Sequence, residues 1–249
     1  MSRGIEVSDR LKSLLTKDAR VVVLTGAGIS AESGVPTFRG EEGLWKKFRP
    51  EELATFDAFM ANPELVWEWY QYRRKIIHEI KPNPGHVALV DFQNHFDEFH
   101  LITQNVDGLH HQAGLRNVVE LHGNIRKNKC IQCGKKYESL EETIQGTPPE
   151  CRCGGKIRPD VVWFGEMLPQ DAIRHAFEVS ERCDLFFSVG TSAVVHPAAS
   201  LPLIAKRSGA FVAEVNLEPT EISHVVDETL LGKSGEILPY LVKFLKCAD

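Results

Sequence analysis

A glycine-rich turn directly after an apolar strand constrains this chain more than any other feature. Val21–Thr25 is a β-branched run that is typical of a buried parallel strand. The next residues, Gly26-Ala27-Gly28-Ile29-Ser30-Ala31, fit the pattern G-x-G-x-x-G/A. In that pattern Gly26 permits a tight turn, Gly28 lets the backbone approach a pyrophosphate, and Ala31 allows close helix packing. The turn predicts a dinucleotide site, with NAD as the expected ligand; the alternative is a strand-to-helix turn that merely requires glycine.

Strands and helices are predicted to alternate along the rest of the chain. Apolar runs similar to the first strand recur at 99–103, 184–190 and 210–216. Helical patterns fall between and after them, at 63–80, 85–94, 168–180, 197–208 and 236–246. This alternation predicts an α/β fold, a Rossmann-like parallel sheet with helices on both faces.

Two stretches interrupt the alternation and predict a small second domain. Residues 35–81 contain no convincing strand but are rich in aromatic side chains, Trp45 among them, where an ordinary dinucleotide unit has its second strand. We expect this helical insertion to fold over the cofactor. Residues 123–160 carry most of the cysteines and an excess of basic residues. The large domain then comprises 1–34, 82–122 and 161–249.

Composition narrows the class of protein. The chain has 249 residues, 43% of them hydrophobic and 25% charged, with a net charge of -5. A mildly acidic chain has no general attraction to nucleic acid or anionic lipid. Residues 1–20 lack the apolar core of a secretory signal, and no apolar run is long enough to span a bilayer. We expect a cytoplasmic protein that binds neither nucleic acid nor membranes; its oligomeric state is left open.

Two cysteine pairs predict a metal centre. They are separated by 17 residues and consist of Cys130, Cys133, Cys151 and Cys153. Four thiolates suit a tetrahedral zinc ion and leave no open position for water, so the site would be structural. The alternatives are disulfides or unrelated buried thiols. Cys183 and Cys247 lie far away and are interpreted as core or tail thiols.

Polar residues follow several predicted strands. Ligands of parallel α/β sheets bind outside the carboxyl ends of strands. The candidate groups are Thr25-Gly26, Gln104-Asn105-Val106-Asp107, Gly190-Thr191-Ser192 and Asn216-Leu217-Glu218. His122 is a candidate base because histidine titrates near neutral pH. We interpret His110 and His111 as surface or capping residues.

The order of these motifs resembles the sirtuins, the NAD-dependent protein-lysine deacylases. Six motifs carry the resemblance: Gly26-Ala27-Gly28-Ile29-Ser30, Pro36-Thr37-Phe38-Arg39, Gln104-Asn105-Val106-Asp107, Leu121-His122-Gly123, Val162-Trp163-Phe164-Gly165-Glu166 and Gly190-Thr191-Ser192. The second cysteine pair is C-x-C, where sirtuins usually have C-x-x-C. The resemblance implies a cleft that NAD and an acyl-lysine side chain enter from opposite sides, between the Rossmann-like domain and a small zinc-bearing domain.

The same resemblance implies roles for individual residues. The acyl oxygen would attack C1′ of the nicotinamide ribose, nicotinamide would leave, and His122 would act as general base on the ribose hydroxyls. The products would be O-acyl-ADP-ribose and free lysine. Gln104 and Asn105 would hold the ribose and support the reacting geometry, which makes Asn105 a second catalytic residue beside His122. Ile29 and Asp107 would line the nicotinamide pocket. The remaining assignments cover the cleft and adenosine half (Phe38, Arg39, Ser192, Asn216 and Ser234) and the peptide clamp (162–166 and 193–195, including Val194).

Tyr70 and Arg73 predict which acyl group is accepted. Three residues apart, they share a helix face. An arginine can form two hydrogen bonds with a carboxylate and a tyrosine hydroxyl can add a third. The pair resembles the Y-x-x-R feature of sirtuins that remove succinyl and malonyl groups, so we expect desuccinylation and demalonylation at least as good as deacetylation. The alternative is a solvated arginine on an amphipathic helix. Competing functions are an NAD-dependent dehydrogenase, a protein ADP-ribosyltransferase and a noncatalytic zinc-bearing module that docks on an acidic partner.

Overall fold

A six-stranded parallel sheet forms the centre of the computed structural model, which describes residues 5–37, 49–138 and 147–245. The strand order is β3-β2-β1-β7-β8-β9. The strands are β1 (Arg20–Thr25), β2 (Glu98–Thr103), β3 (Val119–Glu120), β7 (Leu185–Val189), β8 (Phe211–Asn216) and β9 (Glu228–Leu231). The predicted parallel sheet is therefore confirmed.

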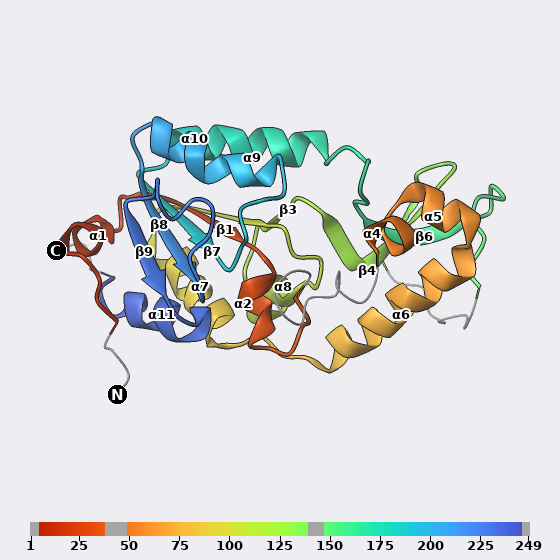
Figure 1. Ribbon diagram of the computed structural model, residues 1–249, viewed down its shortest axis with the longest axis horizontal. Helices are drawn as coiled ribbons and strands as arrows, with labels where there is room; N and C mark the ends of the chain where they lie inside the picture. Colours follow the sequence, from red (N-terminus) through yellow and green to blue (C-terminus); the bar gives the residue numbers. More distant parts are fainter. Residues whose placement is uncertain (1–4, 38–48, 139–146, 246–249) are drawn as a thin grey trace.

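Alternating side chains of β1 build a core on each face of this sheet. Val21 and Val23 pack in one buried cluster, while Val22 and Leu24 pack in another, because successive side chains of a strand point to opposite faces. On the first face lie α7 (Pro84–His95) and α11 (Ser234–Val242), with α1 (Asp9–Leu14) at the end of the sheet. On the other face lie α9 (Gln170–Arg182) and α10 (Leu201–Arg207), which follows the 3-10 turn η1 (Ala198–Ser200) (Figure 1).

A separate three-stranded antiparallel sheet has the order β5-β4-β6. It comprises β4 (Gly123–Cys130), β5 (Lys136–Tyr137) and β6 (Ile157–Val161). The helices α4 (Pro50–Leu53), α5 (Phe56–Ala61) and α6 (Pro63–Glu79) pack against it. Asn62 caps α6 by accepting a hydrogen bond from the amide of Leu65, and Pro63 occupies the first turn.

The short helices α2 (Ala27–Ala31) and α8 (Leu109–Ala113) follow β1 and β2 at the carboxyl edge of the large sheet. The second sheet lies within 123–161, but the predicted domain boundaries remain our proposal. Within the described ranges, no helix is both long and apolar enough to cross a membrane.

The differences from the predicted elements are local. The strands β3 and β9 were not predicted, because one has two residues and the other begins with a glutamate. The last helix begins two residues early, at Ser234, where the Glu32 carboxylate accepts hydrogen bonds from the Ser234 hydroxyl and the Gly235 amide. A cap supplied by a residue two hundred positions away has no local sequence signal.

Candidate active site

A cavity of about 1330 Å³ opens at the carboxyl ends of β1, β2, β7 and β8, and the segment after β6 forms its far wall. Its position is the one that parallel α/β sheets use for ligands. Most of the predicted site residues line it: Gly26, Ala27, Gly28, Tyr70, Arg73, Gln104, Asn105, His122, Val162, Trp163, Phe164, Gly165, Glu166, Gly190, Thr191, Ser192, Asn216, Leu217 and Glu218. The fold thus gathers residues from four strand ends and from α6 around one space.

The glycines of the first turn are needed for a close crossing of two chain segments. The Gly28 amide donates to the carbonyl of Gly190 at 2.7 Å, and a Cβ on Gly28 would lie 2.7 Å from the Gly190 Cα. The Gly26 amide likewise donates to Val189 at 3.0 Å. Both amides are therefore engaged by the end of β7. The glycines shape the entrance of the cavity. Neither of their N–H groups is available to donate a hydrogen bond to a phosphate, which is the role that the motif suggests.

Three of the predicted residues lie behind the wall. Ile29, Ser30 and Asp107 are buried, and the Ser30 hydroxyl donates to Asp107 at 2.9 Å. The Asn105 amide nitrogen donates to the carbonyl of Gly26 at 2.9 Å and approaches Ser30 Oγ at 3.2 Å. Burial raises the pKa of Asp107, against the opposing effect of the Leu109 amide and the Ser30 hydroxyl. This network fixes the glycine turn relative to β2.

His122 is oriented for proton abstraction. Its Nδ1 lies 2.9 Å from the carbonyl oxygen of Gln104, an acceptor that requires Nδ1 to carry the proton. Nε2 is then the basic nitrogen. Burial lowers the pKa of His122, although the Gln104 carbonyl opposes this shift, so the ring is neutral at pH 7. A neutral imidazole with a fixed tautomer in the cavity wall suits a general base.

Two predicted residues, Ser234 and Val194, do not line the cavity, and three others cannot be placed. Ser234, at the start of α11, donates a hydrogen bond from its hydroxyl to the Glu32 carboxylate and does not line the cavity. Val194 precedes Val195, which does line it. Phe38, Arg39 and Trp45 fall outside the described residues.

The interpretation of His110 as a surface or capping residue is wrong. Its side chain is buried, its Nε2 lies 2.9 Å from the Thr25 hydroxyl, and its ring centroid is 4.9 Å from that of His86. The polar neighbours in sequence conceal that α8 packs against α7. His111, by contrast, has a side chain that is 45% exposed, as expected.

The buried pair of His86 and His110 predicts acid sensitivity. Burial lowers the pKa of His86 in the folded protein from 6.5 to about 4. Between these two values His86 is protonated in the unfolded chain and neutral in the native one, so acid favours unfolding. Stability is therefore full above pH 7 and declines as the pH falls from 6.5 toward 4. From this one group we expect a loss of about 1 kcal/mol in unfolding free energy between pH 7.5 and 5.5.

Urea unfolding of wild type and His86→Asn at both pH values measures this contribution, because losses shared by both proteins cancel. The exposed His224 gives the matched control, His224→Asn, which keeps the wild-type pH dependence. An unchanged pH dependence in His86→Asn would refute the assignment.

Glu214 supports the wall of the cavity and was not predicted from the sequence. It is buried in β8, and its carboxylate accepts hydrogen bonds from the hydroxyls of Thr220, Ser223 and Thr229. Residues 217–221, which line the cavity, are held in place in this way. A lone acidic residue inside an apolar strand was the available signal.

The aromatic and charged side chains at the far end of the cavity form a continuous cluster. The Trp163 indole donates to the Tyr70 hydroxyl at 2.8 Å, and the Arg73 guanidinium lies 5.8 Å from the Tyr70 ring centroid. Burial is the main influence on both pKa values, lowering that of Arg73 and raising that of Tyr70. An arginine nevertheless stays charged, so the end of the cavity carries a buried cation.

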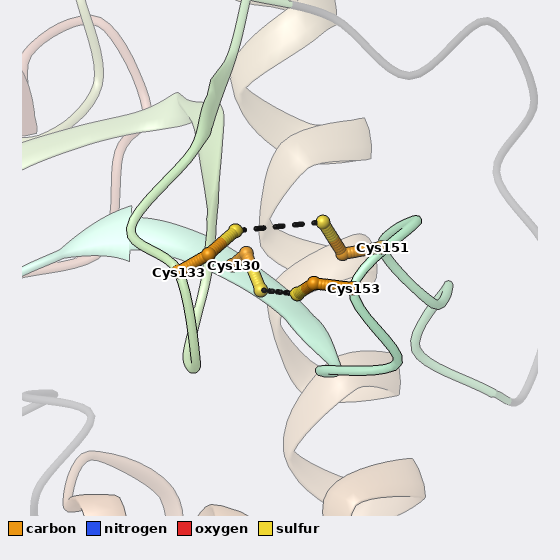
Figure 2. Close-up of side chains that lie close together, drawn as sticks. All are labelled: Cys130, Cys133, Cys151 and Cys153. Atoms are coloured by element: carbon orange, nitrogen blue, oxygen red, sulfur yellow. Dashed lines mark hydrogen bonds between the residues drawn. The ribbon is translucent and has the colours of Figure 1, made fainter.

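The four clustered cysteines meet as the spacing predicts. Their Sγ atoms all lie within 4.8 Å of one another, with 3.5 Å between Cys130 and Cys153 and 3.7 Å between Cys133 and Cys151 (Figure 2). Sulfurs about 2.3 Å from a tetrahedral zinc ion are separated by roughly 3.8 Å. The Cys153 amide and the Tyr137 hydroxyl lower the pKa of Cys151 to about 6, whereas, against the effect of the Gly155 amide, the Cys133 and Cys130 side chains raise the pKa of Cys153 to about 12. The separations of the four sulfurs fit a structural zinc ion.

Comparison with known proteins decides the family. The profile of the Sir2 family matches residues 26–197. This chain belongs to the Sir2 family. An "NAD-dependent protein deacylase" of Aquifex aeolicus is 51% identical over 231 residues, 92% of this chain and 97% of that protein. A relative from Caldanaerobacter subterraneus, "NAD-dependent protein deacylase 1", is 57% identical over 214 residues, 86% and 88% of the two chains.

Solved Sir2 structures share the fold. The crystal structure of a Sir2 homolog–NAD complex has a TM-score of 0.88 and 44% identity, and the alignment covers 98% of this chain and 96% of that one. A Sir2 complex with a p53 peptide and NAD⁺ has a TM-score of 0.83 and 35% identity, over 96% and 98%. The predicted Sir2 membership and fold are confirmed, including four clustered cysteines that lie close enough together for a zinc site.

Proposed function

We propose that this Sir2 protein is an NAD-dependent protein-lysine deacylase that prefers acidic acyl groups and releases nicotinamide and O-acyl-ADP-ribose. The observation that carries the proposal is the position of His122. Its tautomer is fixed by Gln104, and it shares one cavity with the glycine turn and with the Tyr70 and Arg73 pair. The names of the relatives support the deacylase activity, and the buried cation supports the acyl preference.

NAD fits the half of the cavity next to the large sheet. Gly26 and Gly28 keep the entrance free of side chains, while Thr191 and Asn216 offer polar groups beside it. The Asn216 amide donates to the carbonyl of Thr191 at 3.1 Å, which ties the ends of β7 and β8 together. When bound, NAD supplies an electrophilic ribose carbon whose nicotinamide is the leaving group. The solved Sir2 complex with NAD supports this assignment.

His122 would remove a proton from a ribose hydroxyl. Because Nδ1 already donates to the Gln104 carbonyl, the proton can be accepted only at Nε2. The resulting imidazolium would keep its hydrogen bond to that carbonyl, which holds the ring in place throughout. The side-chain amide of Gln104 donates a hydrogen bond to Thr191 Oγ1 at 2.9 Å. This bond connects the ends of β2 and β7 and holds the residue whose carbonyl orients His122.

The acyl-lysine would enter along the segment that follows β6. The Phe164 amide donates to the Ala54 carbonyl at 2.9 Å, and Thr55 and Phe164 form a parallel bridge. One edge of this segment is thus already paired with the chain between α4 and α5. A substrate strand would add along its other edge, as extended peptides do on exposed strands. The solved complex of a relative with a p53 peptide supports a protein substrate.

The far end of the cavity suits a carboxylate. The Tyr70 hydroxyl oxygen accepts from Trp163, so its own proton can be donated to an acyl carboxylate, and the Arg73 guanidinium can add two more hydrogen bonds. A succinyl or malonyl group carries that carboxylate, whereas an acetyl group does not. The pair would therefore bind acidic acyl groups better than acetyl.

Replacing Arg73 by methionine is expected to separate the two activities. Hydrogen bonds to charged groups contribute about 1.5–3 kcal/mol, so kcat/KM for a succinyl-lysine peptide should fall by roughly 10- to 150-fold. With the matched acetyl-lysine peptide we expect a change of no more than a few-fold. Steady-state kinetics of nicotinamide release with both peptides gives the ratio. Lys75→Met, an exposed position on α6, is the control. Undiminished desuccinylation in Arg73→Met would exclude the acyl assignment.

A further inference from the structure

Arg158 is a buried residue beside the far end of the cavity, where Tyr70 and Arg73 lie. Neither the sequence motifs nor the proposed mechanism assigns it a role. Arg158 is 2% exposed, although arginine is rarely buried to this extent. We propose that Arg158 is a positioning residue for acyl specificity, which acts by holding the Trp163 indole and, through it, the Tyr70 hydroxyl. The inference rests on the proposed preference for acidic acyl groups and extends it to a residue on β6.

The guanidinium of Arg158 is held on all of its sides. It forms a bidentate salt bridge with the Glu166 carboxylate, with distances of 2.5 Å from Nη1 to Oε1 and 2.9 Å from Nη2 to Oε2. Nη2 also donates to the Val161 carbonyl at 2.6 Å. Its carbon Cζ lies 3.2 Å from the centroid of the Trp163 ring, the contact of a cation stacked on an aromatic face.

Glu166 closes this arrangement into a ring. Its Oε2 accepts the backbone amide of Trp163 at 2.9 Å, so one carboxylate binds both the guanidinium and the residue stacked on it. Backbone and indole of Trp163 are thereby both fixed. Phe59 packs against the same indole, with 5.4 Å between ring centroids.

The indole transmits this position to the specificity pair. Trp163 Nε1 donates to the Tyr70 hydroxyl, and this bond determines in which direction the tyrosine proton can point. If the indole tilts, the hydroxyl loses the partner that aims its proton at the acyl carboxylate. An acetyl group receives no such hydrogen bond. Disturbing Arg158 should therefore affect succinyl turnover more than acetyl turnover.

The substitution Arg158→Lys tests this idea while keeping the positive charge. Lysine cannot form the bidentate salt bridge or stack as a plane on the indole. In Arg158→Lys we expect the ratio of succinyl to acetyl kcat/KM to fall roughly tenfold, mostly through KM for the succinyl peptide. Arg158→Met should lower the ratio at least as far if it folds.

Arg74 supplies a matched control. Arg74 is a partly buried arginine on α6 that donates hydrogen bonds to the Ile125 carbonyl and to Asn128 on β4, and within the described residues its hydrogen bonds and ring contact do not involve Trp163. Arg74→Lys should lower stability and leave the acyl ratio unchanged.

The decisive step is a double-mutant cycle with Tyr70→Phe. If Arg158 acts through the tyrosine hydroxyl, Arg158→Lys should not change the acyl ratio further in the Tyr70→Phe background. Two results would overturn the inference and leave the proposed function intact: an equal loss of both activities in Arg158→Lys, or an undiminished effect of Arg158→Lys on the ratio in the Tyr70→Phe background. A wild-type protein that does not desuccinylate would overturn this inference and the acyl preference together.

Discussion

Changing His122 to alanine is expected to lower kcat for deacylation by about 10²- to 10⁴-fold, the usual contribution of a general base. NAD binding should persist, because the strand ends and the glycine turn do not depend on the imidazole. The combination distinguishes loss of proton transfer from loss of the site. Nicotinamide release under saturating NAD and peptide measures the first quantity, and calorimetric titration with NAD measures the second.

His111→Ala is the control for this experiment, since His111 is a half-exposed histidine that does not line the cavity. It should retain wild-type turnover. If His122→Ala keeps more than a tenth of wild-type kcat, the imidazole is not the base and the assignment of Nε2 fails.

Loss of one cysteine ligand is expected to have the largest effect on stability. The buried apolar cluster at the cysteine site is small: besides Cys130 and Cys151 themselves it contains Ile157, with Tyr137 packed against it. So small a cluster cannot stabilise the tip of the second sheet by burial alone. Structural zinc contributes on the order of 10 kcal/mol of apparent binding free energy in small domains. Cys133→Ser should therefore lose the zinc ion and unfold at least this part of the sheet.

Metal analysis gives the first readout: one zinc per wild-type chain and none in Cys133→Ser. Amide exchange gives the second, with protection lost in β4 and β5 of the variant. Cys183→Ala is the control, because Cys183 is buried against α9 and far from the other thiols, and it should keep one zinc. Full zinc content in Cys133→Ser would contradict the four-thiolate site.

The parts of the fold that could be predicted are those with a local physical signal. Val21–Leu24 is buried on both faces, so its apolar run marks a central strand. The strand β9 lies at the sheet edge and begins with Glu228, so it carries no such run. Likewise, His110 is buried only because α8 packs on α7, a contact that polar neighbours in sequence cannot reveal.

The residues of the candidate site likewise differ in how well the sequence predicts them. Cysteine spacing encodes the metal centre directly, since ligands two or three positions apart share one turn. Glu214 and Arg158 were missed although their partners lie within 15 positions along the chain, because those spacings match no known motif and depend on how the chain turns after β8 and β6. Gly28 was found for an incomplete reason: the motif anticipates a phosphate, whereas the structure shows that it must fit against Gly190. Sequence therefore located the cavity well and the supports of its walls poorly.

Mass spectrometry of a succinyl-lysine peptide incubated with the protein and NAD distinguishes a deacylase from the competing activities. We expect free lysine, one nicotinamide per lysine and O-succinyl-ADP-ribose, with faster turnover than for the matched acetyl peptide. Reduced NAD would instead indicate a dehydrogenase, and ADP-ribose attached to protein would indicate a transferase. Either product in place of O-acyl-ADP-ribose, or the absence of turnover with every acyl peptide, would exclude NAD-dependent lysine deacylation as the activity of this protein.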